Sequence, residues 1–327
     1  MHRVDPASFA PDPERARQLD ARMRARLGDS LRYVVERAGD ALPVQAGFDA
    51  FVQRLGAGPI HAQTFGAYYE LVLAIDDDEL EVAADLLAEI ARGSPRAPGI
   101  EIRALGDPSD CPFARRYHRL VDTDPNLPIE LEAPPRDVAA VTRERVEQAL
   151  ALLARAHPAL LGELEALLGE IVLATAPTTA GETFDGVSSF MLWGGLVLHA
   201  GSHESPLEML EALAHEGGHS LLFGFSADGP LLENDDEERF PSPLRRDPRP
   251  LDGIYHATFV TARMHHALRH LRDVGALDPA QRDWVTTRLE THQKHFADGL
   301  SVVDRHARLT GVGEAAMRGA RAYMAAA

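Results

Sequence analysis

The stretch over residues 186–224 constrains the fold more than any other part of the chain. It begins with an apolar, β-rich run, VSSFMLWGGLVLHAG, in which Gly194 and Gly195 indicate a turn or bulge. The next run, SPLEMLEALAHEGGHSLLFG, has apolar residues at helical spacing. It starts with Ser205, a favoured N-cap residue, and Pro206, which suits the first position of a helix. We therefore expect a strand, a turn and a long helix in that order.

Most of the other segments have the periodicity of helices. Prolines recur between residues 94 and 136, and there the segments IEIRAL, RRYHRLV and LPIELE alternate and predict short strands. Helices are expected at ERARQLDARMRARLGD, PIHAQTFGAYYELVLAI, DELEVAADLLAEIARG, residues 137–156, LLGELEALLGEIVLAT, residues 252–271, DPAQRDWVTTRLETHQKHFADGL and the tail.

These segments predict an α+β fold that is mainly helical. The helix of residues 206–224 would follow a small β-sheet and pack against further helices. An N-terminal helical region with short strands, residues 1–135, would precede a second region, residues 136–327, or form one continuous domain with it.

Composition excludes several classes of protein. With 33 Lys and Arg against 50 Asp and Glu, the 327-residue chain has a formal charge of −17, which argues against binding to nucleic acid or to an anionic membrane. No apolar run approaches the ~18 residues of a membrane span, and the first twenty residues lack the apolar centre of a secretory signal. The single cysteine, Cys111, excludes an internal disulfide and an all-thiolate metal site. We therefore expect a soluble, cytoplasmic protein.

The long helix carries an HExxH motif, His215-Glu216-Gly217-Gly218-His219. Residues four apart lie on one face of a helix, so both imidazoles can reach one metal ion, and Glu216 can point toward a metal-bound water. About one such chain in twenty would contain this pattern by chance, so its position on a helix after a β-rich segment is what makes it informative. Glycines weaken a helix, and two of them inside the motif indicate close packing against a neighbour.

Two imidazoles do not complete a metal site, so a third ligand is needed. The extended pattern HExxHxxGxxH is not present. His256 is the best candidate, because it shares helical spacing with Phe259 and Val260 and would lie on the inward face of the next helix. Two carboxylates, Glu233 and Asp252, are the alternatives. His265, His266 and His270 follow on the same helix, and we assign them to its surface.

The segment PSPLRRDPRPLDG joins the two helices. Its prolines stiffen the backbone, and Arg245, Arg246 and Arg249 offer planar guanidinium groups that match carboxylates. Such a rigid loop before a metal-ligand helix suggests an anion site. The alternative is a loop held by salt bridges to the acidic residues 235–238, and both can hold for different arginines.

Together, HEGGHSLLF and SPLRRDPRPLDGIYHATFVTARM resemble a bacterial family encoded beside ribosomally made, modified peptides. Its members are described as 2-oxoglutarate-dependent, HExxH-type peptide β-hydroxylases. The resemblance runs from about Glu211 to Leu268 and does not cover the first 180 residues.

The resemblance implies a non-haem Fe(II) enzyme that uses 2-oxoglutarate and O₂ and acts on a precursor peptide. It implies that His215, His219 and His256 bind the iron, and that Ser242, Arg245, Arg246 and Arg249 belong to the segment that binds the cosubstrate. The usual facial set is two histidines and one carboxylate, so a three-histidine set would be a departure. Glu216 is retained in the motif without an assigned peptidase role.

Two functions from different classes of enzyme are therefore compatible with the sequence. In a peptide hydroxylase an arginine is needed for 2-oxoglutarate, and Glu216 need not act as a base. In a zinc metallopeptidase Glu216 is the general base, and no rigid arginine loop is needed. A metal-free binding partner of a peptide-modifying assembly would not need the intact histidines.

Overall fold

The computed structural model describes residues 5–43, 45–107, 109, 111–121, 129–177, 184–243 and 247–327. Within them the chain is mainly helical with one small sheet, which confirms the expected α+β class. It divides into two compact units: unit 1 contains Met1–Ala16, Val146–Leu164 and Ser205–Ala327, and unit 2 contains Arg17–Arg145 and Glu165–Glu204. The division falls inside three helices, and the boundary expected between residues 135 and 136 stays a prediction. Among the described residues, none of the helices combines the length and apolar character needed to cross a membrane.

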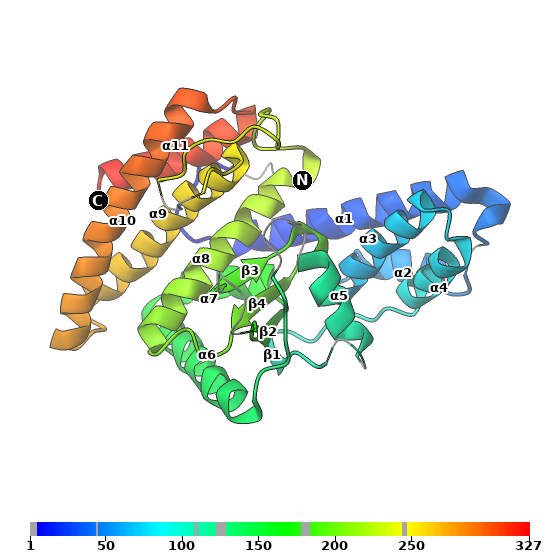
Figure 1. The fold of residues 1–327 in the computed structure, drawn as a ribbon, viewed down its shortest axis with the longest axis horizontal. Coiled ribbons are helices and arrows are strands. Elements are labelled where there is room, and N and C mark those ends of the chain that lie inside the picture. Colours follow the sequence, from blue (N-terminus) through cyan, green and yellow to red (C-terminus); the bar gives the residue numbers. More distant parts are fainter. Residues whose placement is uncertain are drawn as a thin grey trace. The chain divides into compact units, whose positions relative to one another are not determined.

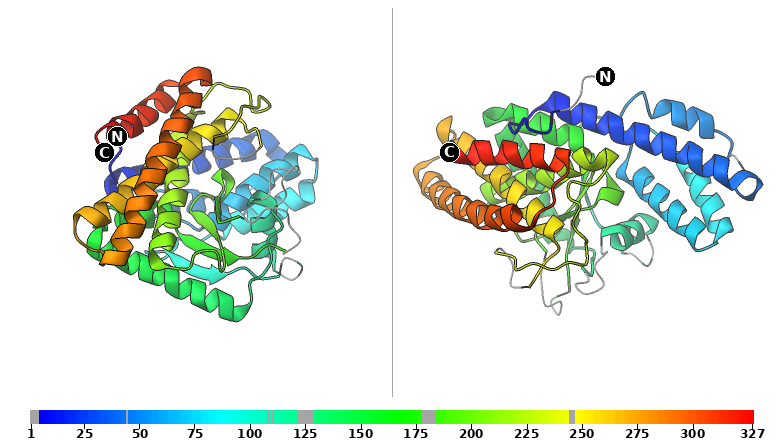
Figure 2. Two further views of the ribbon diagram at one scale, coloured as in Figure 1. Left: turned by 60° about the vertical axis from the view of Figure 1, so that its left-hand side comes forward. Right: turned by 90° about the horizontal axis from the view of Figure 1, so that it is seen from above.

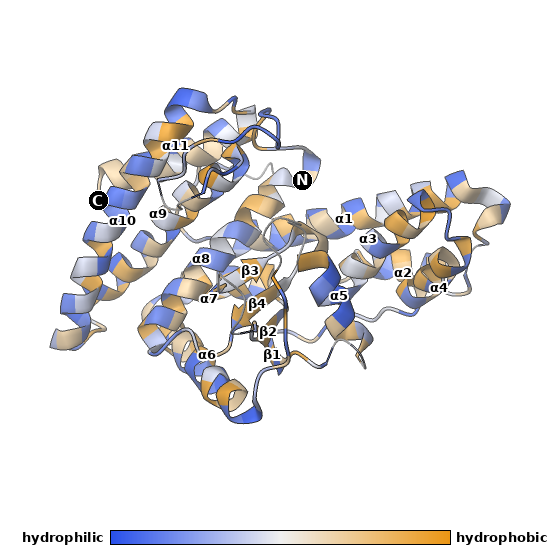
Figure 3. Ribbon diagram, in the orientation of Figure 1, coloured by the Kyte–Doolittle hydropathy of each residue, from blue (hydrophilic) through white to orange (hydrophobic). Residues whose placement is uncertain are grey.

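Unit 2 carries the four-stranded sheet (Figure 1). The strand order is β1-β2-β4-β3, in which β1, β2 and β4 are parallel and β3 is antiparallel to β4. The strands are β1 (Glu101–Ala104), β2 (Glu170–Ala174), β3 (Gly186–Ser188) and β4 (Gly195–His199). β2 is buried along its whole length and β4 along most of it, as expected of central parallel strands; their apolar character is visible in Figure 3. Gly194, at φ +90°, makes the turn expected before β4.

The helices of unit 2 agree with most of the expected segments. They are α1 (Pro13–Ala38, of which the first turn belongs to unit 1), η1 (Gly39–Ala41), α2 (Phe48–Arg54), α3 (Ala62–Asp76), α4 (Leu80–Ala91), α5 (Pro112–Val121), the first half of α6 (Arg136–Ala156) and η2 (Phe190–Leu192).

Two of the expected segments are wrong. The segment RRYHRLV, predicted as a strand, lies in α5, because Phe113, Tyr117 and Leu120 recur at helical spacing behind Pro112, a good first helical residue. The apolar side of α5 packs on the sheet, and Tyr117 donates a hydrogen bond to Glu170 at 2.8 Å.

The second error is the helix expected through LLGELEALLGEIVLAT. The helix α7 (Pro158–Leu167) ends before Gly169, and the remainder forms β2. A short apolar run fits a buried strand and a buried helix equally well by periodicity alone. Of LPIELE, residues 127 and 128 lie outside the described residues, and Glu132 forms an isolated antiparallel bridge with Thr175.

Unit 1 is helical. It contains α7 except its last turn, α8 (Pro206–Phe225), η3 (Ser226–Asp228), α9 (Leu251–Asp273), α10 (Pro279–His306) and α11 (Gly311–Ala325). α9 packs against α8, α10 and α11, and these helices lie side by side in both views of Figure 2. The N-cap role expected of Ser205 is confirmed, because its hydroxyl accepts a hydrogen bond from the Glu208 amide. Pro206 is the first residue of α8, as expected.

The histidines assigned to the surface of α9 are partly buried in unit 1. His265 is buried, and its Nδ1 lies 2.8 Å from the Tyr323 hydroxyl. The ring of His270 stacks on that of His157 with 3.9 Å between the centroids, and His266 lies 5.5 Å from the same ring. His157 Nε2 and His266 Nδ1 are both buried and find no hydrogen-bond partner in the described part of the chain.

These imidazoles predict a loss of stability in mild acid. Burial, with a neighbouring histidine as the next cause, lowers the pKa of His157 and of His265 to about 4. Because unfolded histidine titrates near 6.5, the unfolded state takes up protons first. Stability is therefore fully present above about pH 6.5 and falls toward pH 4, by up to ~1.4 kcal/mol per pH unit for each group. Urea unfolding from pH 7.5 to 4.5 measures this slope, which should be shallower in His157→Gln; an equal slope in both proteins contradicts the assignment to His157.

Candidate metal centre

The helix α8 brings the two histidines of the HExxH motif together on one face. His215 Nε2 and His219 Nε2 are 3.1 Å apart. Two nitrogens bound to one metal ion at ~2.1 Å and at right angles would be separated by about 3.0 Å. The two Nε2 atoms are therefore spaced as adjacent ligands of a single ion.

The two glycines of the motif sit where α8 touches its neighbours in unit 1. A Cβ on Gly217 would collide with the side chain of Leu164, and one on Gly218 would lie 2.9 Å from Val260 Cγ1. The close packing expected from these glycines is thereby confirmed. It lets α8 approach α7 and α9 closely enough to bring the motif next to His256.

Gly218→Ala is expected to lower the free energy of unfolding by ~1–3 kcal/mol, because Val260 is β-branched and cannot easily move away from the new methyl group. Gly253→Ala in α9 is the matched control, since nothing lies within 4 Å of its would-be Cβ. The control should gain up to ~1 kcal/mol from helix propensity. Denaturant unfolding measures both changes, and an equal gain in the two variants would contradict the packing of α8 on α9.

His256, in the second turn of α9, lies against His219 as expected, but on the other edge of its ring. The two Nδ1 atoms are 3.0 Å apart, and the rings are nearly parallel, at 20° with 5.2 Å between centroids. His256 Nε2 lies 3.9 Å from Asp252 Oδ1. The three histidines are thus neighbours, yet their nitrogens do not converge. Accordingly, the described residues contain no ready-made group of three His, Cys, Asp or Glu side chains that could hold a metal ion.

Burial keeps the central imidazoles neutral. It lowers the pKa of His219 well below the ordinary value, and the neighbouring His215 and His256 lower it further. The pKa of His256 is also lowered by burial, against a smaller opposing effect of the Asp252 carboxylate. Metal ions bind the neutral form of imidazole, so this histidine cluster suits a divalent cation. Its donor set, two imidazole nitrogens with carboxylates nearby, fits Fe(II) and Zn(II).

Glu216 lies beside the paired nitrogens. Its side chain is buried, and its Oε1 is 3.8 Å from His215 Nε2. That distance leaves room for a water molecule or a metal ion between the carboxylate and the imidazole. Of the other carboxylates considered as third ligand, Asp252 contacts His256, whereas Glu233 is exposed and its backbone amide donates to the carbonyl of Arg308.

The arginine segment is described in part. Arg245 and Arg246 lie outside the described residues. Arg249 exchanges two backbone hydrogen bonds with Phe240, which closes the loop just before α9. Its Nε lies 2.7 Å from Asp247 Oδ2 without the alignment of a hydrogen bond. The ion pair of Arg249 is therefore with a carboxylate from within the loop, whereas the alternative considered from the sequence was a pair with residues 235–238.

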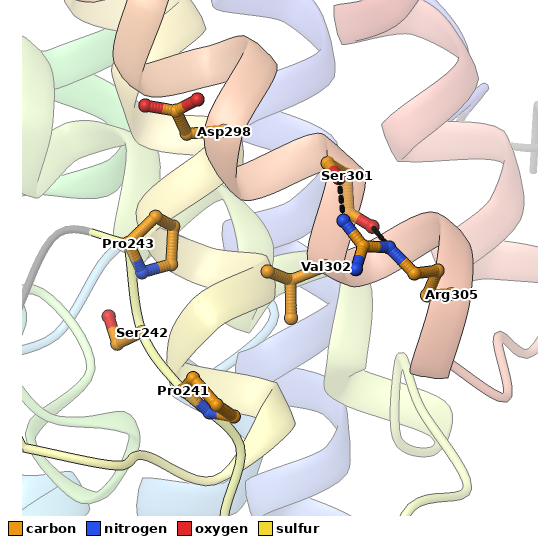
Figure 4. Close-up of a pocket in the computed structure, with 7 residues that line it drawn as sticks. All are labelled: Pro241, Ser242, Pro243, Asp298, Ser301, Val302 and Arg305. Carbon is orange, nitrogen blue, oxygen red and sulfur yellow. Dashed lines mark hydrogen bonds between the residues drawn. The ribbon is translucent and has the colours of Figure 1, made fainter.

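Ser242, assigned to cosubstrate binding with these arginines, lies at a shallow cavity of about 310 Å³ (Figure 4). The loop residues Pro241, Ser242 and Pro243 form one wall, and the other is formed by Asp298, Ser301, Val302 and Arg305 of α10. None of the three clustered histidines lines this cavity. The cosubstrate role of Ser242 stays a prediction.

Two residues of α8, one in contact with the histidine cluster and one a turn before it, were not identified from the sequence. Phe223 packs its ring 6.4 Å from that of His219 and 5.5 Å from that of His256. Glu211, one turn before His215, is buried and accepts hydrogen bonds from Arg288 of α10. The spacing of four residues from a motif histidine is the signal that could have found both.

No protein-family model matches this chain, and no curated protein matches it significantly. The histidine cluster and its surroundings are therefore the features that point to a function.

Proposed function

We propose that this protein is a non-haem Fe(II)- and 2-oxoglutarate-dependent oxygenase that hydroxylates the β-carbon of a residue in a ribosomally made precursor peptide. The observation that carries the proposal is the 3.1 Å spacing of His215 Nε2 and His219 Nε2, in a cluster where burial favours neutral imidazole. The resemblance of HEGGHSLLF and the following arginine segment supports iron over zinc. Such peptides are made in the cytoplasm, where we expect the protein to act.

When bound, iron and 2-oxoglutarate supply the oxidising power that a carbon–hydrogen bond requires. One O₂, one 2-oxoglutarate and one peptide C–H group give succinate, CO₂ and a C–OH group. The chain's own contribution is to hold the ion through His215 and His219 and to leave its remaining positions open. Phe223 and the buried face of α9 exclude water from one side of the imidazoles.

A cation is needed for the far carboxylate of 2-oxoglutarate. Arg249 is the described candidate, since it precedes the helix of His256 and its side chain is 22% exposed. Asp247 holds this guanidinium in the same loop, so a carboxylate ligand would take over part of that contact. Arg245 and Arg246 are proposed for the same role from the sequence.

A zinc metallopeptidase is the second candidate, and the position of Glu216 is the observation that favours it. A buried carboxylate 3.8 Å from a metal-binding nitrogen is suitably placed to take a proton from a metal-bound water. In the hydroxylase, the Glu216 carboxylate would lie beside the ion but would not serve as the base of a peptidase.

Succinate formation tests the proposal. Anaerobic protein loaded with Fe(II) and 2-oxoglutarate should form succinate when O₂ is admitted, and precursor peptide should increase the yield. Arg249→Ala should raise the 2-oxoglutarate concentration needed for half-maximal succinate formation by roughly 10- to 100-fold. That factor corresponds to the free energy of one lost hydrogen bond to a charged group. Arg272→Ala, in α9 and 38% exposed, is the control and should change little. Peptide cleavage that needs zinc and is lost in Glu216→Gln, without succinate, would overturn the hydroxylase in favour of the peptidase.

A further inference from the structure

The three histidines of the cluster contact one another through different ring nitrogens: His219 meets His215 through Nε2 and His256 through Nδ1. This difference indicates different roles for His215 and His256. We propose that His256 is not a metal ligand but the positioning partner of His219, and that it fixes the orientation of that imidazole from the side facing away from the metal. This inference rests on the proposed metal centre, whose ion it assigns to His215 Nε2 and His219 Nε2.

The nitrogens of His219 are both accounted for. Its Nε2 faces His215 Nε2 at 3.1 Å, and its Nδ1 faces His256 Nδ1 at 3.0 Å. The lone-pair directions of the two nitrogens in one imidazole diverge by about 140°, so they cannot point at the same ion. A metal ion shared by His215 and His219 is therefore on the Nε2 side, away from the contact with His256.

The protons follow from this arrangement. A neutral His219 that binds a metal through Nε2 carries its proton on Nδ1 and donates it. His256 Nδ1 is then the acceptor, so the proton of the neutral His256 must be on Nε2. Asp252 Oδ1 lies 3.9 Å from that Nε2, beyond hydrogen-bond distance but close enough to favour a proton there. Metal-binding histidines usually donate their second N–H to a carboxylate, a backbone carbonyl or water, and here the neutral imidazole of His256 takes that place.

Packing holds His256 in this position. Its side chain is buried in α9, with only 7% of the residue exposed, and its ring is flanked by those of His219 and Phe223. To bind the ion on the Nε2 side of His219, the His256 ring would have to leave the stacked arrangement. The third protein ligand, or its replacement by cosubstrate, must then come from another group near the two Nε2 atoms.

The direct test is to count the metal-bound nitrogens in the 327-residue chain. We would record long-range ¹H–¹⁵N spectra of protein labelled with ¹⁵N-histidine, before and after adding Zn(II) as a diamagnetic probe. Zinc should shift one nitrogen each of His215 and His219. His256 should keep two nitrogens without zinc and carry its proton on Nε2, and His219 should show a hydrogen-bonded Nδ1 proton.

Zinc affinity gives the second measurement. His256→Gln keeps a carbonyl acceptor for His219 and cannot replace an imidazole ligand, so zinc should still bind at one ion per chain, roughly 10- to 100-fold more weakly. Asp252→Asn should also lower the zinc affinity, by a smaller factor than His256→Gln. Asp273→Asn, a similarly exposed carboxylate in the last turn of α9, is the control and should leave the affinity unchanged.

The outcomes separate this inference from the proposed function. A zinc-shifted nitrogen on His256 overturns the positioning role and leaves the metal centre intact. If zinc shifts neither His215 nor His219, both the positioning role and the metal centre are overturned. The two-histidine pattern, found in a protein that forms no succinate, supports the positioning role and counts against the hydroxylase alone.

Discussion

His219→Ala should abolish both metal binding and 2-oxoglutarate turnover, the largest effect expected of any single substitution in this protein. His219 stands between the other two histidines, with one ring nitrogen 3.1 Å from His215 and the other 3.0 Å from His256. Its removal deletes one ligand and also removes the contact through which His256 reaches the metal site. Loss of an outer partner alone costs about 10- to 100-fold in metal affinity, so loss of the ligand should exceed ~100-fold.

Anaerobic Fe(II) titration and the rate of succinate formation measure these two losses. His118→Ala, in α5 of unit 2, is the control and should retain both properties. Circular dichroism of the variant should match that of the parent protein. An affinity for Fe(II) within about tenfold of the parent's would contradict the assignment of His219 as a ligand.

Glu163→Gln should produce the largest loss of stability. Glu163 is 1% exposed, and its carboxylate binds two buried guanidinium groups: Arg15 Nη2 at 2.7 Å and Arg263 Nη2. It also accepts a hydrogen bond from the Asp12 amide at 3.0 Å. Removing this anion from its two guanidinium partners leaves buried charges without compensation, which costs ~3–5 kcal/mol. The same cluster anchors the N-terminal segment, because Arg15 and Arg263 donate to the carbonyl groups of Ala10 and Phe9.

The matched control is Glu165→Gln, two residues along in the same helix and exposed. It should change the free energy of unfolding by less than ~0.5 kcal/mol. Urea unfolding of both variants and the parent at pH 7 measures the difference. If Glu163→Gln costs no more than the control, the cluster does not hold a compensated buried charge.

Sequence patterns were sufficient for the long amphipathic helices and for the motif. Ser205 and Pro206 predicted where α8 begins, because capping is a local property of a few residues. The short elements were harder. The segments that became α5 and β2 were misassigned, since seven residues or fewer carry too few repeats to separate periods of 2 and 3.6, and burial on both sides removes the polar positions that mark a face.

The histidine cluster was predictable as a set of neighbours but not as an arrangement. The HExxH spacing determines that His215 and His219 share a face of α8, and helical spacing in α9 indicated that His256 points inward. Which nitrogen of each ring faces which partner depends on how two helices pack, and here that packing depends on Gly218 meeting Val260. No sequence pattern encodes that contact.

Ion pairs between residues far apart in the chain could not be predicted from the sequence either. Glu163 lies 148 residues from Arg15 and 100 residues from Arg263 along the chain. In the sequence, all three look like ordinary charged residues of three helices. Their burial follows only once these helices pack together in unit 1. The same holds for Arg288, which reaches Glu211 from α10.

Iron and 2-oxoglutarate binding in one site is the central claim, and anaerobic optical titration tests it most directly. Adding Fe(II) and then 2-oxoglutarate to the metal-free protein should produce a visible charge-transfer band that saturates at one ion and one cosubstrate per chain. The band should be absent from His219→Ala and should require more 2-oxoglutarate in Arg249→Ala. If no band forms in the parent protein while zinc binds tightly at the same histidines, iron oxygenase chemistry is contradicted and the peptidase assignment of Glu216 takes its place.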